Sequence, residues 1–445
     1  MNDLVNRGLA RLRAVLGSAA AGNGRAALRP KQLEQLRQQL QECADGTGGE
    51  VTARQRAARL GAAYLRLDDE GRCEFLRLIA HEFRPDPVAV AEAHAAYQRA
   101  IGSGAEWDAE ARLRQVLRSA RLRILTQFNA LPQGVKFLVD LRADLLRYLD
   151  QGAELAALDR ELESRLGAWF DVGFLELQRI GWNSPAALLE RLITYEAVHE
   201  IRSWDDLRNR LDSDRRCYGF FHPRMPEEPL IFVEVALTDR LADSIQALLD
   251  EQAPLFAAPR ADTAIFYSIS NTQPGLRGVS FGNFLLKRVI DDLQRDFPRL
   301  KHFATLSPLP QFAHWLAANP GDLAAAGVDL DAATLAAGEW RADAKLARRL
   351  REPLTQLAAR YLLEARAQGR PFDPVARFHL GNGARIERIN WLADTSAKGM
   401  KQSCGLMVNY LYDPEAIEAN VEAFVATGKI PAAASVRRQG RPRPD

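Results

Sequence analysis

The sequence has little cysteine, and that scarcity excludes two kinds of site. Its 445 residues include four cysteines, which are Cys43, Cys73, Cys217 and Cys404. They are far apart and form no Cys-x-x-Cys pair, so the sequence indicates neither a disulfide framework nor a zinc site. We expect free thiols in a reducing compartment, and therefore a cytoplasmic protein.

The chain also lacks an excess of charge of either sign. With 59 basic and 57 acidic residues its formal net charge is only +2, which gives no reason to expect a nucleic acid or a membrane surface as partner. No apolar run approaches the roughly 18–20 residues that span a bilayer. The N-terminus has no apolar signal-peptide core, and residues 441–445 do not form a peroxisomal Ser-Lys-Leu tail.

What is present is enough apolar sequence for two domains. Hydrophobic residues make up 47% of the chain, whose length exceeds one ordinary core. Residues 1–183 have apolar side chains at helical spacing, divided by turn signals, so we expect a domain of about seven or eight helices. It carries no recognisable chemical motif, and its lone histidines, His81 and His94, are expected to be structural. Residues 431–445 are rich in Pro, Ala and Arg and are expected to be disordered.

The pattern changes near Trp182, and residues 184–430 are expected to form a second domain. Ser184-Pro185 has the form of a helix cap followed by proline at the first helical position. Helices are expected over Pro185–Ala197, Asp239–Gln252 and Arg341–Ala367. Strands are expected over Cys217–Phe221, Leu230–Leu237 and Gly405–Tyr412, and over Phe378–Ala393 around a turn at 381–383.

The stretch from Ala264 to Phe312 organises this second domain. A buried strand is expected over Ala264–Ser270 and a short one over His302–Leu306, with an amphipathic helix over Asn283–Leu293 between them. The loop before the helix combines glycine with a helix N-terminus, whose free N–H groups and positive dipole end suit a pyrophosphate. We therefore predict a phosphate-binding loop formed by Arg277, Gly278, Val279, Ser280, Phe281, Gly282 and Asn283.

Four blocks of sequence carry a resemblance to a known family. They read YSISNTQPGLRGVSFGNFLLKRV from Tyr267, LSPLPQF from Leu306, FHLGNGARIERINWLAD from Phe378 and SCGLMVNYLY from Ser403. In these blocks the chain resembles the malonyl-CoA decarboxylases. The resemblance implies an α+β protein, in which an all-helical N-terminal domain precedes a mixed α/β catalytic domain with the fold of the GNAT acetyltransferases. It also implies a homo-oligomer, a dimer or tetramer, assembled through the helical domain.

The resemblance implies that the substrate is malonyl-CoA and the products are acetyl-CoA and CO2. Loss of CO2 leaves two electrons on the α-carbon, and the thioester carbonyl takes them up as an enolate, so no metal or organic cofactor is expected. The enzyme must bind CoA, stabilise the enolate oxygen and deliver a proton to carbon. By resemblance Ser307 and His379 are the catalytic pair, and which of them delivers the proton stays open. Tyr412, Asn382 and Tyr267 are candidates for the lining of the same cleft.

Other interpretations of the same loop exist. Gly278–Gly282 fits Gly-x-Ser-x-Gly, the nucleophile elbow of serine hydrolases, with Ser280 as nucleophile. A true elbow directly follows its strand, whereas Asn271–Arg277 intervenes here. The loop also departs from the acetyltransferase pattern Arg/Gln-x-x-Gly-x-Gly/Ala, because Ser280 stands at the first glycine. A GNAT acyltransferase and a non-catalytic CoA-binding protein are further alternatives. His302 is expected to point away from Ser307, since five residues along a strand separate them.

Overall fold

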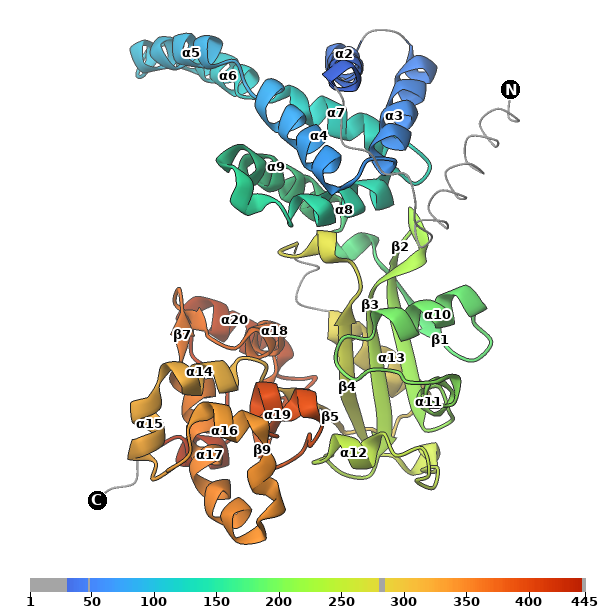
Figure 1. Cartoon of the computed structure of the whole chain (residues 1–445), viewed down its shortest axis with the longest axis vertical. Coiled ribbons are helices and arrows are strands. Elements are labelled where there is room, and N and C mark those ends of the chain that lie inside the picture. The colour runs from blue at the N-terminus through green and yellow to red at the C-terminus, as the bar shows by residue number, and fades with distance from the viewer. Residues whose placement is uncertain (1–29, 47–48, 280–284, 442–445) are drawn as a thin grey trace. The chain divides into compact units, whose positions relative to one another are not determined.

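The computed structural model describes residues 30–46, 49–279 and 285–441, and it divides into two compact units (Figure 1). Unit 1 runs to Asp171 and also includes Pro223–Pro226 and the segment from Gln273 to the end of the described loop. Unit 2 comprises the other described residues, from Val172 onward. No helix in these described ranges has the length and apolarity required to traverse a bilayer.

Unit 1 is built from helices, as the spacing of its apolar residues predicts. Side chains cap several of them: Asp68 accepts from the backbone N–H of Gly71, and Asp86 accepts from that of Val88. The helices of its described residues are α2 (Pro30–Asp45), α3 (Glu50–Leu65), α4 (Asp69–Glu82), α5 (Pro87–Ala100), α6 (Glu106–Val116), α7 (Ala120–Asn129), α8 (Gly134–Leu145) and α9 (Ala153–Trp169).

Unit 2 is organised around a mixed sheet with the strand order β1-β2-β3-β4-β5-β10-β6, and β9 pairs with β10. β4 and β5 pair in parallel, which requires a crossover, and α13 lies on that connection. The strands are β1 (Glu176–Ile180), β2 (Arg215–His222), β3 (Met225–Thr238), β4 (Thr263–Asn271), β5 (His302–Thr305), β6 (Ser307–Pro308), β9 (Arg385–Asn390) and β10 (Met407–Tyr412), besides the separate pair β7 (Arg366–Ala367) and β8 (Arg370–Pro371).

Helices pack on this sheet and fill out the rest of unit 2. The core between them includes Ile265 and Tyr267 of β4, Ala304 of β5 and Met407 of β10, each at most 1% exposed. The helices are α10 (Ala186–Tyr195), α11 (Trp204–Arg210), α12 (Ile245–Leu248), α13 (Leu285–Asp296), α14 (Phe312–Ala318), α15 (Pro320–Ala325), α16 (Ala332–Ala337), α17 (Ala344–Glu364), α18 (Pro374–Gly381), α19 (Ala397–Ser403), α20 (Ile417–Thr427) and α21 (Ala434–Gln439).

A helical region followed by a mixed α/β region is the predicted fold class, and it is confirmed. Besides the strand expected from Phe378 onward, which is described with the active site, three expectations about single segments are wrong. Residues 176–180, expected to be helical, form strand β1, which pairs antiparallel with β2. The helix expected over Asp239–Gln252 is reduced to α12. The tail, expected to be disordered, forms α21 in its described part, and Val436 in that helix is 1% exposed. The domain limits at 183 and 430 stay predictions.

Candidate active site

Ser307, the serine predicted to be catalytic, lies beside a break in the sheet. β5 and β6 pair with the same strand, β10, and are separated only by Leu306. At the same level the register between β9 and β10 shifts at Asn409 and Tyr410. Such irregularities turn side chains out of the regular ladder and are common beside active sites. Ser307, directly after the break, is 7% exposed and lies opposite Val408.

His379 comes to this place on a helix, so the strand expected from Phe378 onward is wrong at its start. Asp373 caps α18 by accepting from the backbone N–H groups of Val375 and Ala376, and Pro374 occupies the first turn. This cap and proline are typical of a helix start. His379 lies in the last turn of α18 and is 3% exposed.

The two predicted catalytic residues are in contact, and two further hydroxyls extend the contact into what we call the His379 network. His379 Nε2 lies 3.1 Å from Ser307 Oγ, and His379 Nδ1 lies 2.8 Å from Tyr412 Oη. Ser307 Oγ in turn donates to Thr305 Oγ1 at 2.9 Å. Because the serine proton points to Thr305, Ser307 Oγ accepts from Nε2–H. The neutral ring then carries its proton on Nε2, and Nδ1 accepts from Tyr412.

The His379 network is buried and uncharged. Burial lowers the pKa of His379 to about 3, because the charged imidazolium would lose its hydration. Burial likewise raises the pKa of Tyr412 well above its ordinary value, so the phenol keeps its proton. Tyr410 stacks on the imidazole with ring centroids 4.6 Å apart, which fixes the plane of the ring. The arrangement can pass a proton along a line of neutral donors and acceptors.

The other predicted lining residues have separate partners. Asn382 caps α18, and its side-chain nitrogen donates to the carbonyl of Phe378 at 2.8 Å. Its Oδ1 is buried without a hydrogen-bond partner in the described structure. Tyr267 is buried in the core of unit 2, and no hydrogen bond to Ser307, His379 or Tyr412 is among its contacts there. His302 is exposed at the start of β5.

The predicted phosphate loop is described only in its first part. Ser280, Phe281, Gly282 and Asn283 lie outside the described residues, whereas Arg277, Gly278 and Val279 lie within them and belong to unit 1. Gly278 has a φ of +85°, a conformation that favours glycine.

A buried ion-pair cluster, which we call the Arg142 cluster, holds the segment that leads into this loop. Arg142 of α8 is paired with Asp159 at 2.8 Å and Glu163 at 3.2 Å. Its Nη1 donates to the carbonyls of Gly275 at 2.9 Å and Arg277 at 2.7 Å. A Cβ on Gly275 would lie 1.8 Å from the carbonyl oxygen of Val139, so only glycine permits this approach to α8.

Two residues of the site, Thr305 and Tyr410, were not predicted from the sequence. Thr305 accepts from Ser307 and also from the backbone N–H of Tyr410 at 3.1 Å, and Tyr410 covers the imidazole. Strand periodicity could have found both, because Thr305 and Ser307, like Tyr410 and Tyr412, are two residues apart and share a face. In the described part of the chain no three His, Cys, Asp or Glu side chains gather in a way that could hold a metal ion.

Comparisons with known proteins cover nearly the whole described chain. The family model of the malonyl-CoA decarboxylase C-terminal domain matches residues 173–444, and that of the malonyl-CoA decarboxylase N-terminal domain matches residues 83–170. A curated relative, the mitochondrial malonyl-CoA decarboxylase of Anser anser anser, is 38% identical over 400 residues, which are 82% of this chain and 79% of that protein.

Solved structures show the same similarity. The crystal structure of malonyl-CoA decarboxylase from Rhodopseudomonas palustris has a TM-score of 0.83 and 43% identity, and it covers 91% of this chain and 99% of that one. That from Agrobacterium vitis has a TM-score of 0.82 and 40% identity, with 92% and 100% covered. The similarity therefore spans both units.

Proposed function

The chain belongs to the malonyl-CoA decarboxylase family, and from this premise we propose that its His379 network delivers the proton consumed when malonyl-CoA is converted to acetyl-CoA and CO2. The observation that carries the proposal is the 3.1 Å contact of Ser307 Oγ and His379 Nε2 inside a buried, uncharged network. A neutral proton donor suits the step, because an enolate is a far stronger base than the carboxylate from which it forms.

The first step breaks the bond between the α-carbon and the carboxylate. CO2 leaves, and the electron pair of that bond passes into the thioester carbonyl to form an enolate. The substrate thus supplies its own electron acceptor, and on this chemical ground we propose that neither a metal nor an organic cofactor takes part. Buried polar hydrogens near the enolate oxygen stabilise the charge that develops there.

The second step forms a C–H bond. In the proposed path Ser307 turns its proton from Thr305 to the α-carbon of the enolate. His379 replaces it from Nε2–H while Tyr412 donates to Nδ1, so the imidazole stays neutral but passes to its Nδ1–H tautomer. Tyr412 recovers its proton from solvent, and the overall reaction consumes one proton for each CO2 released. The resting Nε2–H tautomer then returns by proton exchange with solvent, without further net uptake. General acid–base groups of this kind contribute about 10²–10⁴-fold to rate.

Substrate binding is proposed for the loop and for two residues near the network. Arg277 through Asn283 would bind the CoA pyrophosphate, with backbone N–H groups as donors. The support lies in the glycines of the sequence and in the positive φ of Gly278. Asn382 is proposed to face the acyl group through its unpaired, buried Oδ1 atom. Tyr412 is proposed to act on the acyl group indirectly, through His379 and Ser307. Gly282→Val should raise KM for malonyl-CoA, and an unchanged KM in a folded variant would remove the loop from the proposal.

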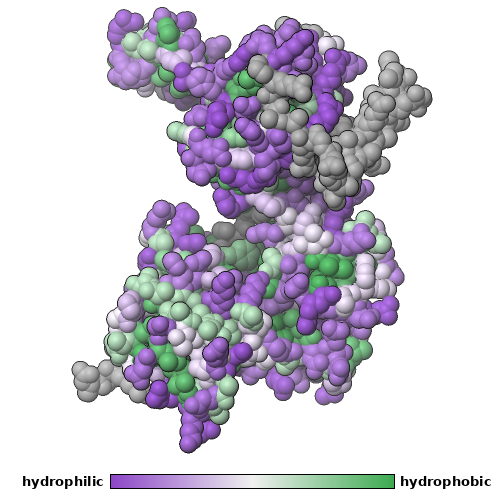
Figure 2. Space-filling model, in the orientation of Figure 1, coloured by the Kyte–Doolittle hydropathy of each residue, from purple (hydrophilic) through white to green (hydrophobic). Residues whose placement is uncertain are grey.

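A homo-oligomer, a dimer or tetramer assembled through unit 1, is also proposed. The hairpin of α5 and α6 supports it, since α6 buries none of its residues and Trp107 is 77% exposed. Val88, Ile101 and Leu117 nearby are each at least half exposed, and Figure 2 shows green hydrophobic patches among the purple surface of this hairpin. Sedimentation of Trp107→Ser tests the proposal, which fails if the variant and the parent protein have the same mass.

A cytoplasmic location is proposed because all four cysteines are free thiols.

Incubation with malonyl-CoA as the only substrate tests the function. The expected products are acetyl-CoA and CO2 in equal amounts, without an acceptor. Free CoA without acetyl-CoA would indicate the serine hydrolase, and a requirement for an amine acceptor would indicate an acyltransferase. Either of these outcomes would contradict the proposed function.

A further inference from the structure

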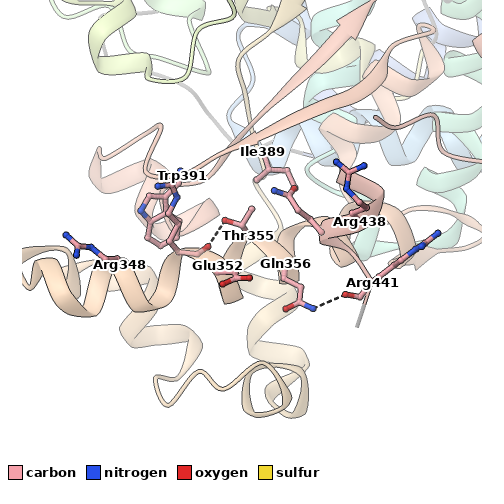
Figure 3. Close-up of a pocket in the computed structure, with 10 residues that line it drawn as sticks. Arg348, Glu352, Thr355, Gln356, Ile389, Trp391, Arg438 and Arg441 are labelled. Atoms are coloured by element: carbon pink, nitrogen blue, oxygen red, sulfur yellow. Dashed lines mark hydrogen bonds between the residues drawn. The ribbon is translucent and has the colours of Figure 1, made fainter. Parts of the chain in front are cut away.

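A second polar site lies in unit 2, away from the residues of the His379 network. It is a pocket of about 460 Å³ between α17, the end of β9 and the C-terminal segment around α21 (Figure 3). Ile389 forms part of its lining and pairs with Val408, which in turn pairs with Ser307. Two strand spacings, about 10 Å, therefore separate this wall of the pocket from Ser307. None of Ser307, His379 and Tyr412 lines it.

The charge of the pocket is strongly positive. Its described lining includes four arginines, Arg348, Arg351, Arg438 and Arg441, and one carboxylate, that of Glu352. None of the four guanidinium groups makes an ion pair in the described part of the chain. By contrast Arg349, next to Arg348 on α17, is paired with Asp329 outside the pocket.

The first part of α17 supplies two of these charges. Lys345, Arg348, Arg349 and Arg351 lie among its first eight residues, and its first turn has no acidic residue. Arg348 and Arg351 are three residues apart, a spacing at which like charges on a helix repel each other. A bound anion would offset this repulsion.

A second positively charged pocket adjoins the same C-terminal segment. This pocket of about 360 Å³ is lined by Arg366, Lys429, Arg437 and Arg441 together with two apolar residues, and none of its described lining residues carries a carboxylate. Arg441 is common to both pockets. The positive potential that attracts an anion to this part of unit 2 therefore extends over both pockets.

The first pocket also has an apolar side. Trp391, half-buried, lines it beside Ile389 and is held in place by Trp340, whose ring centroid lies 5.6 Å away. Thr355 and Gln356 of α17 add neutral polar groups, and Gln356 donates to the carbonyl of Arg441 at 3.0 Å, which ties the C-terminal segment to α17. The pocket therefore combines a flat aromatic wall, apolar surface and several guanidinium groups.

We propose that this pocket binds a nucleotide-like phosphate ester. Guanidinium groups match phosphate oxygens with paired donors, and the indole suits a flat heterocyclic ring. A volume of about 460 Å³ lies within the range of small-ligand sites. Two sources share this chemistry: a free nucleotide, and the nucleotide end of a CoA ester.

Calorimetric titration of the full-length protein tests the site. The probes are pyrophosphate, ADP and uncharged adenosine, each at low and at high salt. The variants are Arg351→Gln and Arg438→Gln, whose side chains are exposed, and the matched control is Arg349→Gln. We expect ADP to bind more tightly than pyrophosphate or adenosine, and salt to weaken the binding of both anions. Each pocket variant should weaken ADP binding by about tenfold or more, the scale of one charge-assisted hydrogen bond, and the control should not.

Two results would overturn the proposal: equal binding of ADP by the parent protein and by the variant lacking both Arg351 and Arg438, or an equal loss in Arg349→Gln. Titration of ADP with saturating acetyl-CoA separates the two sources. Independent binding of both ligands identifies a free nucleotide, and competition that disappears in the pocket variants identifies the nucleotide end of CoA. ADP that binds only at the substrate loop would be insensitive to Arg351 and Arg438, which again contradicts the proposal.

Discussion

The Arg142 cluster of unit 1 is charged, whereas the His379 network of unit 2 is neutral. Arg142 and His379, at their centres, are both buried and have hydrogen-bond partners on all their side-chain nitrogens. In the cluster the guanidinium donors are taken up by two carboxylates and two backbone carbonyls. In the network each link joins groups that can both give and accept a proton.

This difference separates holding a segment from moving a proton. A guanidinium keeps its proton at any pH at which the protein is folded, so the Arg142 cluster can fix the backbone at Gly275 and Arg277 without taking part in chemistry. A neutral imidazole between two hydroxyls can change its bonding pattern at low cost, because no buried charge appears or disappears in the resting state. Charge is thus found where rigidity matters, and neutrality where protons move.

The largest effect on stability should follow from opening the charged cluster. Arg142→Met keeps most of the aliphatic volume but leaves Asp159, 12% exposed, without its partner. We expect the free energy of unfolding to fall by about 3–5 kcal/mol, the usual cost of breaking a buried pair. Urea unfolding measures it. The matched control is Arg147→Met, whose partly exposed pairs with Asp69 and Asp144 should contribute less than about 1 kcal/mol. Equal losses in the two variants would contradict the contrast.

The next effect concerns two tyrosines of β10 that both contact His379 with their rings and differ in their hydroxyl contacts. Tyr412 Oη bonds His379 Nδ1, whereas Tyr410 Oη has no hydrogen-bond partner in the described structure. Tyr412→Phe should lower kcat by about tenfold, the scale of one buried hydrogen bond, and leave KM unchanged. Tyr410→Phe should change kcat by about twofold at most, because only an unpaired hydroxyl is removed. Steady-state kinetics of both variants decides, and an equal loss would remove Tyr412 from the network.

The sequence predicts the regular strands and helices of unit 2 better than it predicts the active site. The strands over Cys217–Phe221 and Leu230–Leu237 and the helix ending near Leu293 are confirmed within β2, β3 and α13, because their apolar periodicity is regular over several residues. The neighbourhood of Ser307 and His379 rested on the family resemblance, since a serine before a proline and a lone histidine carry no signal of their own.

The segment around His379 shows why the rest could not be predicted. The segment from Phe378 to Gly383 has apolar residues and a Gly-Asn-Gly turn, which favour a strand. The helix-start signal Asp373-Pro374 lies five residues before Phe378, and the segment up to Gly381 is helical. The described tail was misassigned for a different reason. Its composition is typical of disorder, yet a single buried side chain, Val436, and hydrogen bonds to β9 order it. Tertiary contacts of this kind leave no local pattern.

A further expected effect is a change in how stability depends on pH. His379 has a folded pKa of about 3, below the ordinary value of 6.5 for histidine, so the unfolded chain binds the extra proton between these two values. Its contribution to stability is complete above pH 6.5 and is lost progressively as the pH falls toward 3. In His379→Gln this dependence should be weaker by up to one proton, and chemical unfolding at pH 4, 5, 6 and 7 measures it. Burial also lowers the pKa of His199 to about 4, but this residue is present in both proteins. Its contribution therefore cancels when the stability of the variant is subtracted from that of the parent protein at each pH. Parallel curves would show that His379 is not held neutral.

The most direct test of the central claim is acetyl-CoA formation from malonyl-CoA by Ser307→Ala, His379→Ala and the variant with both changes. If the two residues act in one proton path, each single change costs about 10²–10⁴-fold in turnover, and the double change costs little more than the larger single one. Ser280→Ala, at the competing hydrolase position, should keep most of the activity, and circular dichroism should show that all variants are folded. Near-native rates for the single variants, a double variant whose loss equals the product of the two, or loss of activity in Ser280→Ala alone would contradict the account.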